Sequence, residues 1–134
     1  MKEIDQFIED WTETASGNKK AFIELYEHLK GLEATELDWN ARPKVSYSLR
    51  PRHAAQKNRA LFAMVDVIDD DPDERWLSVC FYGEMITDPD EAGDLIPEGL
   101  LGEDGYCFDL YEYDADEVAY LKARLTQAHS NAKE

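Results

Sequence analysis

The stretch Arg75-Trp76-Leu77-Ser78-Val79-Cys80-Phe81-Tyr82-Gly83 is the most strongly β-prone run in the sequence, and it contains no proline. Successive side chains of a strand point to opposite faces, so Leu77, Val79 and Phe81 share one face. Trp76, Ser78, Cys80 and Tyr82 share the other. Because both faces are largely apolar, the run predicts a central strand of a sheet that is covered on both sides.

Three further strand patterns surround this run. Residues 44–50 alternate apolar and polar, which predicts a half-exposed strand that Pro51 ends, followed by a polar loop. Residues 59–68 form the next strand, and the acidic segment 69–74 predicts a hairpin turn back into the central strand. Residues 105–111 form the last strand. The segments 33–43 and 83–104 show no sustained pattern and are predicted to be irregular, with a short helical turn at 88–93.

Three amphipathic patterns predict helices. The first covers residues 2–14 and the second residues 19–30, with Asn18 as the N-cap of the second. The third begins at Asp114, with Glu117 three residues later as in a capping box, and residues 130–134 are expected to fray. The order predicts an α+β fold in which two N-terminal helices and one C-terminal helix pack on an antiparallel sheet of four to five strands.

Length and composition are those of one folded domain, residues 1–134. The chain is 43% hydrophobic and 11% aromatic, which is enough to form a core. No window has the roughly 18 apolar residues of a membrane span, so no membrane association is expected. The first residues are acidic and amphipathic, unlike a secretory signal, and a cytoplasmic location is therefore expected.

The two cysteines, Cys80 and Cys107, each lie in an apolar strand pattern. A disulfide between neighbouring strands is geometrically possible. Buried free thiols are the favoured prediction, because a cytoplasmic protein sits in a reducing environment. Burial in an apolar strand raises the pKa of a thiol, which argues against a cysteine nucleophile.

Charge is distributed very unevenly along the chain. The formal net charge is −16, yet residues 66–117 contain 19 acidic residues and a single basic one, Arg75. A field this negative disfavours nucleic acid and anionic membranes as partners. Residues 42–59 contain six basic residues and no acidic one. The favoured interpretation of this basic segment is an internal counter-charge for the acidic half of the chain. The alternative is a contact with an acidic protein partner or with a second copy of the chain, through Arg50, Arg52 and His53.

Two acidic clusters are candidate sites for a hard cation, which prefers oxygen ligands. The first is formed by Asp69, Asp71 and Asp73, and the second by Asp88, Asp90 and Glu91. The first cluster fails as an EF-hand, because Glu74 stands where that loop needs glycine and Cys80 where it needs glutamate. Solvated surface is the favoured interpretation of both clusters, and weak binding of calcium or iron is the alternative; no cofactor is expected otherwise.

Several short motifs resemble the YdhG-like family of small, mostly uncharacterised bacterial proteins. They are Leu77 to Gly83, Met85-Ile86-Thr87-Asp88-Pro89 and Leu100-Leu101-Gly102, followed by a strand and a C-terminal helix. The resemblance covers about the last two-thirds of the chain. It implies a frataxin-like fold and, from one member proposed as an iron chaperone, a metal-carrier function. Glu103-Asp104-Gly105-Tyr106 stands where the family has basic residues, so no binding residue is carried over.

No catalytic signature is present, and the sequence leans away from an enzyme. The first functional hypothesis is a non-enzymatic interaction or adaptor domain. The alternative is a carboxylate-rich protein that binds or carries iron or calcium.

Overall fold

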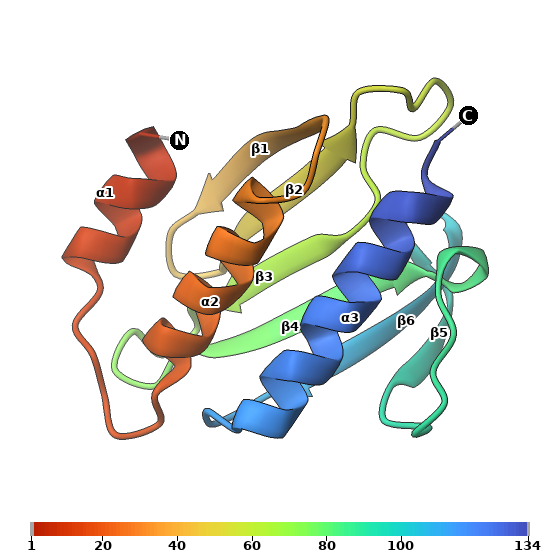
Figure 1. Ribbon diagram of the computed structural model, residues 1–134. Helices are drawn as coiled ribbons and strands as arrows, with labels where there is room; N and C mark the ends of the chain where they lie inside the picture. The colour runs from red at the N-terminus through yellow and green to blue at the C-terminus, as the bar shows by residue number, and fades with distance from the viewer. Residues whose placement is uncertain (1, 134) are drawn as a thin grey trace.

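Strand β4 (Trp76–Tyr82) lies in the interior of a six-stranded antiparallel sheet, as the sequence predicts. A computed structural model describes residues 2–133 (Figure 1). The strand order is β1-β2-β3-β4-β6-β5, and every neighbouring pair is antiparallel. The remaining elements are α1 (Lys2–Asp10), α2 (Asn18–Lys30), β1 (Thr35–Arg42), β2 (Ser46–His53), β3 (Met64–Ile68), the 3-10 helix η1 (Gly83–Met85), β5 (Asp94–Leu100), β6 (Glu103–Leu110) and α3 (Ala115–Asn131). The α+β prediction is confirmed, with six strands in place of four to five.

The helices cover only one face of the sheet (Figure 1). Leu77, Val79 and Phe81 point to that face and are fully buried, and Phe81 meets the ring of Phe108 edge-on at 5.8 Å. Trp76, Ser78 and Cys80 point to the opposite face and are only half-buried. The prediction that β4 is covered on both sides is therefore wrong. This face carries polar and charged residues, among them Ser48, Asp66 and Ser78, in place of the apolar residues of the helix-covered face.

Strand β1 occupies the segment that was expected to be irregular. Its pairing partner β2 runs on through Pro51, which pairs with Leu37. The carbonyl of Pro51 accepts a hydrogen bond from Phe62 N at 2.8 Å, on the side of β3. The backbone nitrogen of Pro51, which has no hydrogen, faces that same side. The β2–β3 ladder has already ended there, because its last pair is Leu49 with Val65. Proline is tolerated there because no ladder hydrogen bond is lost.

Strand β5 lies within the segment 83–104, also expected to be irregular. Six of its seven residues are exposed, and a register shift between Ile96 and Leu100 interrupts its pairing with β6. An exposed edge strand needs no alternation of apolar residues, so its sequence carries no strand pattern. The helical turn expected at 88–93 is a single hydrogen-bonded turn, closed by Glu91 N donating to Asp88 O at 3.0 Å. The Asp88 carboxylate also accepts Ala92 N and Gly93 N at 3.1 and 2.9 Å.

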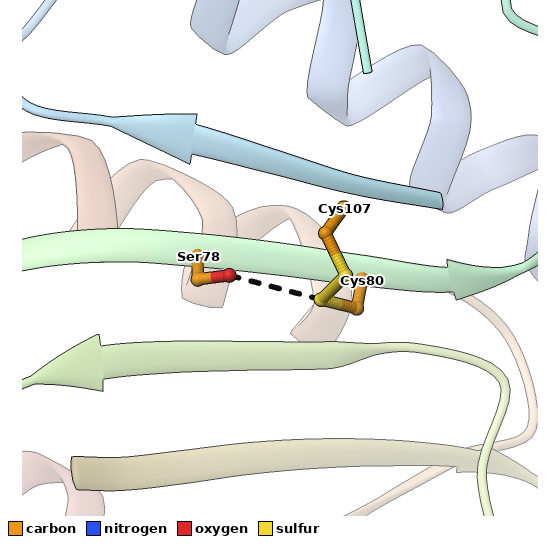
Figure 2. The surroundings of a disulfide bond; sticks show 3 residues. All are labelled: Ser78, Cys80 and Cys107. Carbon is orange, nitrogen blue, oxygen red and sulfur yellow. Dashed lines mark hydrogen bonds between the residues drawn. A yellow bond between two sulfur atoms is a disulfide. The ribbon is translucent and has the colours of Figure 1, made fainter. Parts of the chain in front are cut away.

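The cysteines form a disulfide, so the prediction of free thiols is wrong (Figure 2). Antiparallel pairing of β4 with β6 places Cys80 directly opposite Cys107, with their Cα atoms 4.1 Å apart. Both residues are half-buried on the open face of the sheet, and Ser78 Oγ lies 3.7 Å from Cys80 Sγ. The disulfide forms because the register of β4 and β6 brings these two cysteines, 27 residues apart in sequence, into contact.

Of the two N-caps predicted from the sequence, that of α3 is confirmed and that of α2 is wrong. Asp114 caps α3 as predicted, its carboxylate accepting Asp116 N and Glu117 N. Gly17, in the left-handed conformation with φ 74°, is the N-cap of α2 in place of Asn18. Asn18 is buried and donates instead to Arg75 O and Tyr111 O at 2.9 and 3.0 Å.

The end of α3 is anchored where fraying was expected. Asn131 donates its side-chain amide to Met85 O at 2.8 Å, and Ala132 is fully buried. Residue 134 lies outside the described residues. Within residues 2–133, the helices are all too short or too polar to cross a membrane.

Candidate functional site

A groove opens between the end of β6, the first half of α3 and the loop that leads into β5. Its volume is about 180 Å³. Small-molecule sites usually enclose about 300–1,000 Å³, so this groove suits a long side chain better than a cofactor. Nine residues line it: Asp90, Ala92, Phe108, Asp109, Leu110, Asp116, Glu117, Tyr120 and Leu121.

The floor of the groove is part of the hydrophobic core. Phe108, Leu110 and Leu121 are each at most 5% exposed. Phe108 contacts Phe81 of β4 on one side and the ring of Tyr120 on the other, at 6.1 Å between centroids. Because core side chains are close-packed, the floor is preformed and apolar.

The rim of the groove is acidic. Asp90, Asp116 and Glu117 line it on the helix side, and no basic side chain does. Asp109 borders the groove at the sheet edge, but its carboxylate lies on the open face with Ser78 and Tyr111. No ion pair that joins described residues includes any of these four carboxylates. The pKa of Glu117 is raised, chiefly by burial and also by repulsion from Asp114 and Glu112. The rim therefore has a negative potential, which favours a cation as its binding partner.

The loop before β5 is fastened to α3 at one wall of the groove. Tyr120 donates its hydroxyl to Asp88 Oδ1 and accepts Asp90 N at 3.3 Å. Burial alone would raise the pKa of Asp88, but the bonds from Tyr120, Gly93 and Ala92 lower it overall. The guanidinium of Arg124 stacks over the Tyr120 ring at 4.7 Å. These contacts hold the wall in place beside the helix.

The six acids proposed as metal ligands do not come together. Asp69 is buried and bonded to Arg75 Nε at 2.7 Å and to Lys44 N at 2.9 Å. The Asp71 carboxylate accepts Asp73 N within the β3–β4 turn. In the second cluster, Asp88 holds the loop, Asp90 lines the groove and Glu91 is exposed. Across residues 2–133, no group of three or more His, Cys, Asp or Glu residues is placed to hold one metal ion.

The three residues proposed for partner binding also separate. Arg50 and Arg52 alternate with Pro51, so both project from the open face of β2. Arg52 pairs with Glu36 Oε1 at 2.7 Å and Arg50 donates to Ser48 Oγ. His53 points the other way and is buried, with its ring 4.8 Å from that of His129. The basic segment is thus occupied largely by contacts within the fold.

The groove itself was not predicted from the sequence, although Asp88 and Asp90 were singled out. The hydrogen bond that defines its wall joins Asp88 to Tyr120, 32 residues later. Phe108 and Glu117 appeared only as members of a strand and a helix. No local pattern signals a contact of this kind, because it depends on the docking of α3.

Comparisons with known proteins identify no relative of this chain. Neither a family model, nor a curated protein, nor a solved structure matches the chain.

Proposed function

We propose that the protein is a non-enzymatic interaction domain that binds a cationic segment of a protein partner in the groove between β6 and α3. The observation that carries the proposal is the combination of an apolar floor with three acids on the helix side of the rim, Asp90, Asp116 and Glu117, and no base among the lining residues. A lysine or arginine side chain has the same two parts. Its aliphatic stem can cover Phe108 and Leu121 while its charged end reaches the rim.

The arrangement of the carboxylates favours an extended cation over a single ion. No three acidic side chains of the described residues are gathered for metal coordination, so the rim surrounds the groove without converging on a point. Its volume, about 180 Å³, admits a side chain.

The remaining acidic surface supports the same function at longer range. Residues 66–117 carry 19 acidic residues against one basic residue. A field of this sign attracts cationic partners and raises the rate of encounter, more strongly at low ionic strength. The groove then provides the short-range contacts.

Binding of a labelled basic peptide tests the proposal. A fluorescent eight-residue peptide that alternates lysine with valine is titrated with protein at low salt, and its anisotropy is followed. The double variant Asp116→Asn/Glu117→Gln should weaken binding about tenfold, because two ion pairs of up to about 1 kcal/mol each are lost.

The matched control is Asp70→Asn/Glu74→Gln, which removes the same two charges from the exposed β3–β4 turn. It should weaken binding by less than about twofold, since only the long-range field changes. Equal weakening in the two double variants would show that the peptide senses net charge alone, and the proposal would then be wrong.

A further inference from the structure

One side of β6 has no neighbouring strand at its C-terminal end. The pairing of β5 with β6 reaches only as far as Asp94, which stands opposite Cys107. Strand β6 continues to Leu110, and β4 is the only described strand that borders its last three residues. This short free edge forms one side of the groove, because Phe108, Asp109 and Leu110 all line it.

The cysteine pair shows which backbone groups point to the free edge. In antiparallel sheets, Cα atoms are about 4.5 Å apart in non-hydrogen-bonded pairs and about 5.5 Å apart in hydrogen-bonded ones. The 4.1 Å between the Cα atoms of Cys80 and Cys107 marks a non-hydrogen-bonded pair. The N–H and C=O of Cys107 therefore face β5, and those of Asp109, two residues later, face the same side.

The chain before β5 turns away from this position. Continued pairing would bring Ala92 opposite Asp109, since Asp94 stands opposite Cys107. Ala92 N and Gly93 N instead donate to the Asp88 carboxylate. Tyr120 holds that carboxylate against α3. The edge at Asp109 is thus kept open by the same contacts that form the wall of the groove.

We infer that the partner segment binds as an additional β-strand, whose backbone pairs with the N–H and C=O of Asp109. This inference rests on the proposed function and specifies how the cationic segment is held. In an extended strand every second side chain points to the same face. Lysine or arginine at alternate positions therefore places successive cations over the helix-side rim formed by Asp90, Asp116 and Glu117.

Charge decides between a partner protein and a second copy of this chain. Two copies carry a formal charge of −16 each and repel one another. Within this chain, Arg50 and Arg52 belong to β2, an interior strand already paired with β1 and β3, so they cannot be offered as a free strand. The occupant is an extended basic segment of another protein.

A pair of variants at position 109 tests the strand addition. Asp109→Pro removes the N–H that faces the edge, whereas Asp109→Asn removes the same charge and keeps the N–H. The β4 ladder is spared in both, because the N–H of residue 109 points away from β4. With the lysine–valine peptide, the proline variant should bind about tenfold more weakly than the asparagine variant. Tenfold is the change in affinity expected when about one backbone hydrogen bond is lost.

A second measurement leaves the protein unchanged, so it does not depend on the folding of the proline variant. The peptide is N-methylated at alternate residues in the two possible frames, which keeps every charge and removes alternate N–H groups. One frame should lose binding about tenfold and the other should retain it, as expected when a single edge of the peptide is used. Thermal melts of both protein variants establish that they are folded.

The outcomes separate the two proposals. If both methylated peptides bind as tightly as the parent while Asp116→Asn/Glu117→Gln still weakens binding, strand addition is wrong and the cationic groove stands. If that double variant behaves like its control, the groove itself is wrong. If the chain forms a dimer in sedimentation that Asp109→Pro abolishes, the occupant is a second copy and the assignment to a partner protein is overturned.

Discussion

At the scale of single residues, the ionised carboxylate of Asp66 lowers the stability of the folded state. It lies on the open face of the sheet between Ser48 and Ser78, and its Oδ1 is buried with no hydrogen-bond partner in the structure described. Burial raises its pKa, and Ser48, Arg50 and Arg42 oppose that rise only in part. The native protein therefore favours the protonated form of Asp66 more than the unfolded chain does.

Replacing Asp66 by asparagine should stabilise the protein near neutral pH. A folded pKa above the unfolded value means that ionised Asp66 destabilises the native state at pH 7, and that this effect fades as the pH falls. We expect Asp66→Asn to gain about 1 kcal/mol at pH 7, the usual scale for a buried unsatisfied group. The gain should shrink toward pH 4. Urea titrations of both proteins at each pH measure it, and a loss of stability at pH 7 would show that Arg50 and Ser48 outweigh burial.

At the scale of elements, the disulfide ties the edge hairpin β5–β6 to the interior strand β4. Its cysteines are 27 residues apart in sequence, and chain entropy assigns a loop of that size about 3–4 kcal/mol of stability. Adding dithiothreitol should therefore lower the urea midpoint of the protein. A Cys80→Ala/Cys107→Ala variant should be insensitive to the reductant. Two thiols titrated in the denatured, unreduced protein would contradict the bond.

The elements that sequence predicts well are those whose signals are local. Helix α3 follows from a four-residue apolar stripe and from Asp114, which caps it within the next three residues. Strand β4 follows from its own alternation. In both, neighbours in sequence provide the information, so the pattern and the structure agree.

The elements that sequence misses depend on distant contacts. Pro51 continues β2 only because the β2–β3 ladder has already ended, and β5 forms only because β6 offers it an edge. The cysteine pair depends on the register between β4 and β6, and the groove depends on the bond from Tyr120 to Asp88. Each involves tertiary pairing that overrides or bypasses local preference.

At the scale of the whole molecule, the acidic residues do not act as one uniform group. Burial raises the pKa of Asp66 and of Glu117, and repulsion adds to the rise at Glu117. A side-chain bond from Arg59 lowers the pKa of Glu103 despite some burial, and the bonds to Asp88 lower its pKa as well. As the pH falls, protonation of Asp66 and Glu117 removes a destabilising charge and so raises the stability of the fold. Protonation of Glu103 and Asp88 removes a stabilising charge and so lowers it. A pH titration of the wild-type protein therefore mixes opposing effects, and screening by salt is the cleaner test of repulsion.

Sodium chloride should raise the melting temperature of the whole protein. The chain carries 30 acidic residues against 14 basic ones, and 19 of the acids fall within residues 66–117. Close carboxylates repel by about 1 kcal/mol per pair in water. At 0.5 M salt the Debye length shortens to about 4 Å, which screens exposed charges. Buried Asp69–Arg75 is screened much less, so the stabilising ion pair survives while exposed repulsion is weakened.

Calcium and magnesium should add nothing beyond this ionic effect. Ion-specific stabilisation requires several carboxylates at one point, and no three acidic side chains within residues 2–133 are placed to hold a metal. Melts in NaCl, CaCl₂ and MgCl₂ at matched ionic strength should therefore give the same temperature. A rise specific to calcium would revive the metal hypothesis, and it would contradict the groove proposal if the ion were held by residues 88–104. Alanine substitutions in 69–74 and in 88–104 would then show which loop holds the ion, because only one of them would abolish the rise.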